Sequence, residues 1–345
     1  MLFRSSKLVG ALPEEVVVMN QLTVNLHLLL ITFYRPGKVR NKILCESKAF
    51  PSDQYALESQ VKMHGLDPAN AIIEIEPREG EYAIRTEDII AKIKKHAKEL
   101  SIVMFGGVNY YSGEVLDMKA ITEAAHAAGA ICGFDLAHAI GNIELKMHDW
   151  DLDFACWCSY KYLNSGPGGV AGAYIHSRYI TDISLPRLAG WWGHEKSSRF
   201  QMEKGFKPIQ TAEGWQLSNA PVLSMAAHKA SIDIFDEAGM DNLIAKSNQL
   251  AAFCHFILED VNNGFPVKQF LVITPGEASR HGCQVSILFN QYGKEVFGML
   301  SQNGIVSDWR EPNVIRIAPV PLYNSFEDVY RFGKALKDSI ESLLS

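Results

Sequence analysis

Short apolar runs alternate with amphipathic stretches through the first two thirds of the chain. Three runs are almost uniformly apolar, as in strands that are buried on both faces: residues 101–105, 131–134 and 154–158. Two stretches repeat apolar positions at helical spacing, residues 86–100 and 117–128. We expect Thr86 to cap the first of these helices and Gly129 to end the second. The alternation predicts an α/β fold in which a mostly parallel sheet lies between helices.

The last third has a different order of elements. The pattern there predicts a long helix over residues 221–238, strands at residues 269–274, 283–289 and 314–318, and helices at residues 295–303 and 325–344. Such an order is typical of an α+β arrangement. We therefore expect a large domain over residues 1–235 and a smaller α+β domain over residues 236–345.

The composition excludes several classes of protein. A hydrophobic content of 47% and a charged content of 21% exclude a disordered chain. A net charge of −6 without a basic cluster argues against a nucleic-acid partner. The most apolar early run, residues 22–33, is shorter than the roughly 20 residues that span a bilayer. We expect it to form a core helix, and we expect no membrane partner.

The six cysteines do not have the spacing of a disulfide framework, which predicts a reducing compartment. The start of the chain lacks the pattern of a secretory signal, so the cytoplasm is the expected location. Cys156 and Cys158 lie two positions apart on one predicted strand and point to the same face. This arrangement favours buried thiols over a zinc site, and we expect no bound metal.

The residue with the clearest chemical meaning is Lys161. It follows the apolar run 153–160 and precedes a loop of small residues, 164–169. A lysine at the end of a buried strand is costly unless it is paired or used, although a side chain that reaches out to solvent is the simpler alternative. Because small residues let a flat ring approach the amine, we favour a lysine that binds a cofactor.

Asp135 and His138 follow the neighbouring strand at residues 131–134. An aspartate keeps a pyridine nitrogen protonated and makes the ring an electron sink. If a helix begins here, the two side chains share a face; a helix cap and a core histidine are the alternatives. Because the carboxyl ends of parallel strands meet at one edge, we expect Gly106, Asp135 and Lys161 to lie together. These residues predict a site for pyridoxal phosphate.

Other candidate residues each have a simpler alternative. Thr23, near the start of the first apolar helix, suits a phosphate or an ordinary helix cap. Phe50 suits stacking on a cofactor ring or core packing. Trp191 and Asn219 are pocket walls or packing residues. Arg316 interrupts an apolar strand, so it binds a carboxylate or forms an internal salt bridge.

Five stretches together resemble the kynureninases, which are pyridoxal phosphate enzymes of fold type I. The stretches are residues 19–27, 48–53, 133–138, 153–164 and 316–326. The resemblance implies the fold of the aspartate aminotransferase-like, pyridoxal-phosphate-dependent transferases and a homodimer. It implies hydrolysis of the Cβ–Cγ bond of L-kynurenine or 3-hydroxy-L-kynurenine. The products are L-alanine and anthranilate or 3-hydroxyanthranilate, in tryptophan catabolism and NAD biosynthesis.

The resemblance also implies roles for individual residues. Lys161 would bind the cofactor covalently, and Asp135 would pair with its pyridinium nitrogen. Tyr160 would hold the phosphate and is a candidate for moving protons in catalysis. Arg316 would bind the α-carboxylate of the substrate. The remaining cofactor contacts would come from Leu22, Thr23, Phe50, Pro51, Ser52, Asp53, Gly106, His138, Trp191 and Asn219.

Two features depart from the family pattern. Gly106 stands where the family usually has a hydroxyl residue near the phosphate. Only about twenty residues precede the Leu22-Thr23 motif, where the family has a substantial segment, so we expect an N-terminally shortened chain.

Two other functions stay open at this point. One is a cysteine desulfurase-like enzyme, although such enzymes commonly have histidine where Tyr160 stands and need a cysteine on a mobile loop. The other is a catalytically impaired protein that only binds the cofactor.

Overall fold

The computed structural model describes residues 2–345, with side chains from residue 4 onward, and divides into two compact units. The first unit holds the described residues up to Glu76, Ile84–Gly107 and Asp117–Glu237. The second holds Pro77–Ala83, Val108–Leu116 and Ala238–Ser345. A boundary between residues 235 and 236 stays a prediction, and two short upstream segments group with the C-terminal unit.

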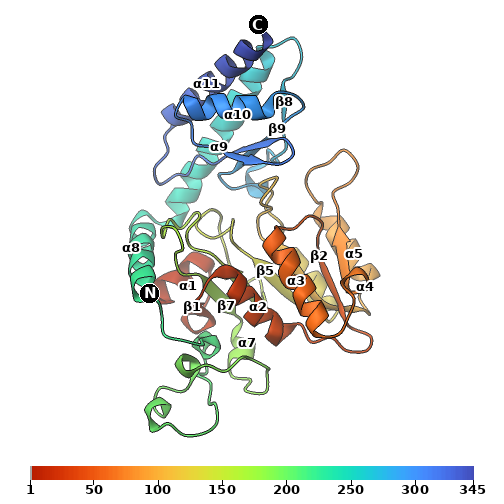
Figure 1. Cartoon of the computed structure of the whole chain (residues 1–345), viewed down its shortest axis with the longest axis vertical. Coiled ribbons are helices and arrows are strands. Elements are labelled where there is room, and N and C mark those ends of the chain that lie inside the picture. The colour runs from red at the N-terminus through yellow and green to blue at the C-terminus, as the bar shows by residue number, and fades with distance from the viewer. Residues whose placement is uncertain (1) are drawn as a thin grey trace. The chain divides into compact units, whose positions relative to one another are not determined.

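The first unit is built on a sheet of seven strands within the described residues (Figure 1). In order across the sheet, these are β1 (Val16–Val18), β7 (Gly172–Ile175), β6 (Phe154–Trp157), β5 (Ile131–Asp135), β4 (Leu100–Gly106), β2 (Lys42–Glu46) and β3 (Ile72–Ile75). The strands from β6 to β3 run parallel, whereas β7 pairs antiparallel with both β6 and β1. The mostly parallel sheet that the apolar runs predict is confirmed.

Helices connect these strands. They are α1 (Leu2–Val9), α2 (Leu22–Phe33), α3 (Pro51–Met63), α4 (Pro68–Ala71), α5 (Thr86–Lys95), α6 (Met118–Ala127), α7 (Ser177–Ile180) and α8 (Val222–Ala238), with 3₁₀ turns η1 (Pro13–Glu15), η2 (Trp191–Gly193), η3 (Arg199–Gln201) and η4 (Ala212–Trp215). Gly129, with a φ of +71°, follows α6 as expected. The cap predicted at Thr86 and the cap considered as an alternative at Thr23 are wrong, because Arg85 and Gln21 are the extended residues before α5 and α2, whereas Thr86 and Thr23 are already helical.

Neighbouring side chains of β5 point to opposite faces of the sheet, as the period of a strand requires. Cys132 meets α6, where its Sγ lies 3.6 Å from Oγ1 of Thr122. The next residue, Gly133, lies under the ring of Phe154, which stacks on Phe33 of α2 at 4.8 Å. Helices therefore cover both faces of the sheet, with α6 on one face and α2 on the other.

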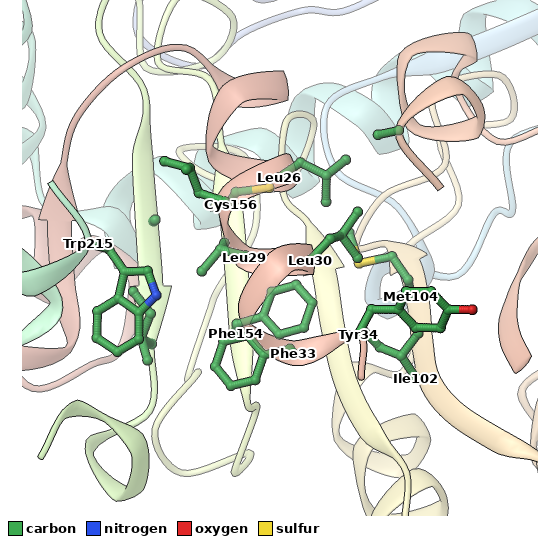
Figure 2. Close-up of a cluster of buried hydrophobic side chains, with 14 of the residues drawn as sticks. Leu26, Leu29, Leu30, Phe33, Tyr34, Ile102, Met104, Phe154, Cys156 and Trp215 are labelled. Atoms are coloured by element: carbon green, nitrogen blue, oxygen red, sulfur yellow. The ribbon is translucent and has the colours of Figure 1, made fainter. Parts of the chain in front are cut away.

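The α2 side of the sheet holds a large apolar core. Figure 2 shows Leu26, Leu30 and Phe33 of α2 beside Phe154 of β6 and Met104 of β4, all of them buried. Because α2 is apolar around most of its circumference, it is buried on nearly every side. The core helix predicted at residues 22–33 is confirmed. Within the described residues, no helix is long and apolar enough to cross a membrane.

The second unit combines an antiparallel sheet with three long helices. The strands, in order, are β10 (Asp308–Arg310), β11 (Val314–Ile317), β9 (Val285–Phe289) and β8 (Phe270–Val272), and the helices are α9 (Met240–Asn263), α10 (Gly293–Gln302) and α11 (Phe326–Leu344), with a 3₁₀ turn η5 (Ala278–Arg280). Ser325 caps α11 in a reciprocal pair with Asp328. Leu250, Ile287 and Leu336 lie in the core between sheet and helices. This smaller α+β unit is the arrangement that the sequence predicts.

Candidate active site

The carboxyl ends of β4, β5 and β6 form one edge of the sheet in the first unit. Gly106 is the partner of Asp135 across β4 and β5, and Asp135 is the partner of Cys156 on β6. The chain leaves β6 at Trp157 and bends into Lys161, whose charge acts on the Asp135 carboxyl. The structure therefore brings Gly106, Asp135 and Lys161 to the same edge, as the parallel strand order requires.

Lys161 is only partly buried, and its amine lies between two groups that the sequence predicts for the site. Its Nζ lies 3.0 Å from Nε2 of His138 and 5.5 Å from the centre of the Phe50 ring. His138 lies in a series of turns over residues 137–142, so the helix considered after Asp135 is wrong. The backbone turns instead because Oδ1 of Asp135 accepts the N–H of Ala137 at 2.7 Å. His138 still faces Lys161, because the turns carry its ring back toward the amine.

The loop after Lys161 is held by hydrogen bonds along its length. The N–H of Ser165 donates to the carbonyl of Ser159 at 3.0 Å, and Gly166 and Gly168 have φ values of +81° and +68°, which favour glycine. From α8, Nδ1 of His228 lies 2.9 Å from Oγ of Ser165. These contacts fix the backbone that carries Lys161.

Two buried carboxyl groups lie close to Lys161. Asp135 is 7% exposed and Asp53, on α3, is 8% exposed. Burial raises the pKa of both, and the neighbouring Asp135 raises the pKa of Asp53 further, whereas the charge of Lys161 lowers both. The two side chains share a hydrogen bond, which raises the pKa of Asp53 and lowers that of Asp135.

The same acid pair tests whether the site fits pyridoxal phosphate. Among the described residues, Oδ1 of Asp53 is buried and has no hydrogen-bond partner. A pair of buried carboxyl groups with a spare acceptor needs a positively charged donor. A pyridinium N–H is such a donor, so the residues present fit the group. Asp53 and Asp135 would hold its nitrogen end.

The first turns of two helices meet near this edge. Oγ1 of Thr23, in the first turn of α2, lies 2.7 Å from Oγ of Ser52, in the first turn of α3. Leu22 begins α2 and Pro51 begins α3. Two hydroxyl groups and two helix N-termini form a setting that suits a phosphate.

Gly106 uses its backbone N–H in a contact that the sequence does not predict. The N–H donates to Oε1 of Glu46 at 3.2 Å, and Glu46 is 4% exposed. The signal for Glu46 in the sequence is a glutamate at the end of the apolar strand Lys42–Glu46, because a buried glutamate needs a partner. The N–H of Gly106 is thus already paired within the protein.

Tyr160 precedes Lys161 and is partly open to solvent. Burial of its hydroxyl and the nearby Cys158 raise the pKa of Tyr160 to about 12. Its phenol therefore keeps its proton at neutral pH and acts as a hydrogen-bond donor.

Trp191 and Asn219 lie in the long connection between α7 and α8. The Nε1 group of Trp191 donates to the carbonyl of Arg199 at 3.3 Å, and its ring meets Phe200 edge-on. A cavity of about 400 Å³ lies along this connection, next to Trp191 and His194. Asn219 is exposed. A cofactor contact for these two residues stays a prediction.

Arg316 lies on β11 of the second unit. Its Nε donates to Oδ2 of Asp308 at 2.9 Å, a second guanidinium nitrogen pairs with the same oxygen, and a third donates to the carbonyl of Tyr110. The side chain is only 9% exposed. The internal salt bridge considered for this arginine is therefore present, and binding of a substrate carboxylate stays a prediction.

Comparison with known proteins places this chain among relatives. Residues 243–336 match the kynureninase C-terminal domain family. A kynureninase of Flavobacterium psychrophilum is 56% identical over 336 residues, which cover 97% of this chain and 79% of the relative. A kynureninase of Rattus norvegicus is 48% identical over 341 residues, with 97% and 73% covered. The chain belongs to the kynureninase family.

Comparison with solved structures confirms the expected fold of this chain, which is that of the fold-type I, pyridoxal-phosphate-dependent enzymes. A cysteine desulfurase of Thermococcus onnurineus superposes with a TM-score of 0.80 at 19% identity, covering 99% of this chain and 83% of that chain. The cystine C–S lyase C-DES superposes with a TM-score of 0.81 at 15% identity, covering 98% and 85%. At these identities the likeness concerns the fold alone.

Membership in the kynureninase family confirms the enzyme class and the cofactor, pyridoxal phosphate, that the sequence indicates. The desulfurase alternative lacks the nucleophile that it needs. None of the six cysteines forms a disulfide within the described residues and all are buried, and burial raises the pKa of Cys158, the cysteine nearest Lys161 in the chain. A buried, protonated thiol is a poor acceptor of sulfur.

Proposed function

We propose that this protein uses pyridoxal phosphate to hydrolyse the Cβ–Cγ bond of L-kynurenine or 3-hydroxy-L-kynurenine. The products are L-alanine and anthranilate or 3-hydroxyanthranilate. The observation that carries the proposal is the position of Lys161, at the carboxyl edge of the sheet, with its Nζ 3.0 Å from His138. The 56% identity to a kynureninase supports this substrate over those of other fold-type I enzymes.

When bound, pyridoxal phosphate supplies an electron sink for the negative charge that develops at the substrate α-carbon. Asp135 would sustain that sink by keeping a carboxylate against the pyridinium nitrogen. Asp53 would steady Asp135 through their shared hydrogen bond. Phe50, which lies beside Lys161, would pack on a face of the ring.

Lys161 would hold the cofactor covalently and then act as a base once the substrate has displaced it. Its Nζ would take the proton from the α-carbon. The ring of His138 would orient the amine through the contact at Nε2. Tyr160, with its raised pKa, would return a proton as an acid rather than remove one.

The phosphate would lie at the first turns of α2 and α3. The hydroxyl groups of Thr23 and Ser52, which lie 2.7 Å apart, would donate to its oxygens. The first backbone N–H groups of α2, beginning at Leu22, would add the favourable field of a helix N-terminus. Pro51 would shape the start of α3 without adding a donor.

Arg316 would bind the α-carboxylate of the amino acid. Its planar fork suits two parallel hydrogen bonds to a carboxylate. Asp308 holds the guanidinium in place and is itself partly exposed. A substrate carboxylate would therefore displace Asp308 from the guanidinium or share the guanidinium with it. Trp191 and Asn219 would contact the cofactor or the aromatic end of the substrate.

We further propose that the enzyme is a homodimer and works in the cytoplasm. Six buried cysteines that form no disulfide within the described residues support a reducing location. Light scattering of the purified protein and fractionation of its source cells test these two statements separately.

The test of the function is turnover of 3-hydroxykynurenine by the purified, cofactor-loaded protein. We expect fluorescent 3-hydroxyanthranilate and alanine in equal amounts from the wild type. Lys161→Ala should release neither, and Lys94→Ala, which changes an exposed helix lysine, should match the wild type. Cofactor binding without product would instead support a catalytically impaired protein.

A further inference from the structure

Three side chains gather at the edge of the sheet opposite to Lys161. Glu15 ends η1 beside the start of β1, His176 follows the end of β7, and His148 lies in the connection before β6. Val16 pairs with Tyr174, and Phe154 pairs with Ile175, so the start of β1, the end of β7 and the start of β6 share this edge. The group is therefore separate from the candidate active site.

The donor atoms of these residues converge. Oε1 of Glu15 lies 2.9 Å from Nδ1 of His148 and 3.8 Å from Nδ1 of His176, and one donor atom from each residue lies within 4.8 Å of the others. A tetrahedral metal with ligand bonds of about 2.0–2.1 Å separates its ligands by about 3.4 Å. The two distances from Oε1 of Glu15 lie on either side of that value. Small shifts of the side chains would therefore bring these donor atoms to the separations of metal ligands.

The hydrogen bonds of His176 hold its ring as they do in a metal ligand. Its Nε2 lies 3.2 Å from Oδ1 of Asp151, and its Nδ1 accepts the N–H of Arg178 at 3.1 Å. The proton therefore resides on Nε2, and the single lone pair of Nδ1, which accepts the Arg178 N–H, lies 3.8 Å from Oε1 of Glu15. A carboxylate behind the far nitrogen of a histidine is the usual second partner of a metal-binding imidazole.

The charge of Glu15 also favours a cation. Its side chain is fully buried, and within the described residues its ion pairs are with His148 and His176 alone. Backbone N–H groups of Leu12 and Ser177 donate to its two oxygens at 2.9 and 2.8 Å. Histidines carry a positive charge only when protonated, so a buried carboxylate with such partners is stabilised by the permanent charge of a cation.

We propose that Glu15, His148 and His176 bind a divalent transition-metal cation such as Zn²⁺. One carboxylate and two imidazoles suit Zn²⁺ or Co²⁺ better than Mg²⁺ or Ca²⁺, which prefer oxygen donors alone. His148 is 35% exposed, which gives an ion a path and leaves a position for water. Binding at Nδ1 of His148 leaves the ring proton on Nε2 instead of Nδ1, and at His176 the ion replaces the Arg178 N–H.

Calorimetric titration of the cofactor-loaded protein with Zn²⁺ alone tests the site. The wild type should bind one ion, and His148→Ala should bind it at least about tenfold more weakly. His64→Ala removes an exposed histidine outside the cluster and should match the wild type. Because His148 is partly exposed, its replacement should leave the fold intact, which unchanged circular dichroism will verify.

Equal Zn²⁺ affinity of wild type and His148→Ala, or no saturable binding by the wild type, would overturn the site. An equal loss in His64→Ala would do the same, since it would show scattered binding by surface histidines. Co²⁺ gives an independent readout, because a four-coordinate site absorbs visible light strongly. That absorption should appear with the wild type and be lost in His148→Ala.

Discussion

The contact between His228 and the lysine loop makes the first unit sensitive to acid. His228 lies on α8, is 2% exposed and has its Nδ1 2.9 Å from Oγ of Ser165. Burial lowers the pKa of His228 from 6.5 to about 4. Because the unfolded chain then binds the proton first, stability is lost as the pH falls from about 6.5 to about 4.

The size of the effect follows from the two pKa values. Between about pH 8 and about pH 5, the unfolded histidine takes up nearly a full proton and the folded one takes up very little. The difference corresponds to about 2 kcal/mol of unfolding free energy. Because the pKa of Asp53 is raised, its protonation stabilises the folded state as the pH falls over this range, which is opposite to the effect of His228. The pH dependence of the wild type alone therefore does not isolate the effect of His228.

His228→Asn isolates it. Asparagine keeps a polar partner for Ser165 and does not titrate. Urea unfolding followed by tryptophan fluorescence reports mainly on the first unit, because every tryptophan except Trp309 lies there. Relative to the variant, the wild type should lose about 2 kcal/mol between about pH 8 and about pH 5.

An equal pH dependence of wild type and His228→Asn would refute the reasoning. The exposed His64→Asn serves as a matched control and should retain the wild-type dependence. Hydrogen exchange of the lysine loop adds a local measurement. Protection of the Ser165 amide, measured relative to the intrinsic exchange rate at each pH, should fall at about pH 5 in the wild type and not in His228→Asn.

Three further changes test other parts of the structure. Thr23→Val removes the hydroxyl that meets Ser52 and should weaken pyridoxal phosphate binding by about tenfold, or roughly 1.5 kcal/mol, in a fluorescence titration. Arg316→Lys replaces a planar fork by a point charge and should raise KM for kynurenine by about tenfold or more; an unchanged KM would exclude a carboxylate contact. Gly133→Ala places a methyl group in the ring of Phe154 and should lower unfolding free energy by about 1–3 kcal/mol in urea. A variant as stable as the wild type would show that this ring moves freely.

Much of the fold follows from local sequence pattern. The core helix at Leu22–Phe33 and the strands that end at Gly106 and Asp135 were all predicted, because uniformly apolar runs have few other places in a globular protein. The helix considered after Asp135 is wrong, since one side-chain hydrogen bond to Ala137 redirects the backbone. Such a bond is decided by the folded surroundings and leaves little trace in composition.

The site was predicted in part. The parallel strand order predicts that Asp135 and Lys161 meet, and the structure places them at one edge. The pairing of Asp53 with Asp135 and of Glu46 with Gly106 joins residues far apart in the chain. Side-chain contacts of that kind depend on how α3 and β2 pack, which no local pattern specifies.

The central claim is that Lys161 carries the cofactor, and borohydride reduction followed by peptide mass spectrometry tests it most directly. Reduction of the cofactor-loaded protein should leave a pyridoxyl group on the peptide that contains Lys161, and Lys161→Ala should remain unmodified. A pyridoxyl group on another lysine, or none on the wild type, would contradict the account.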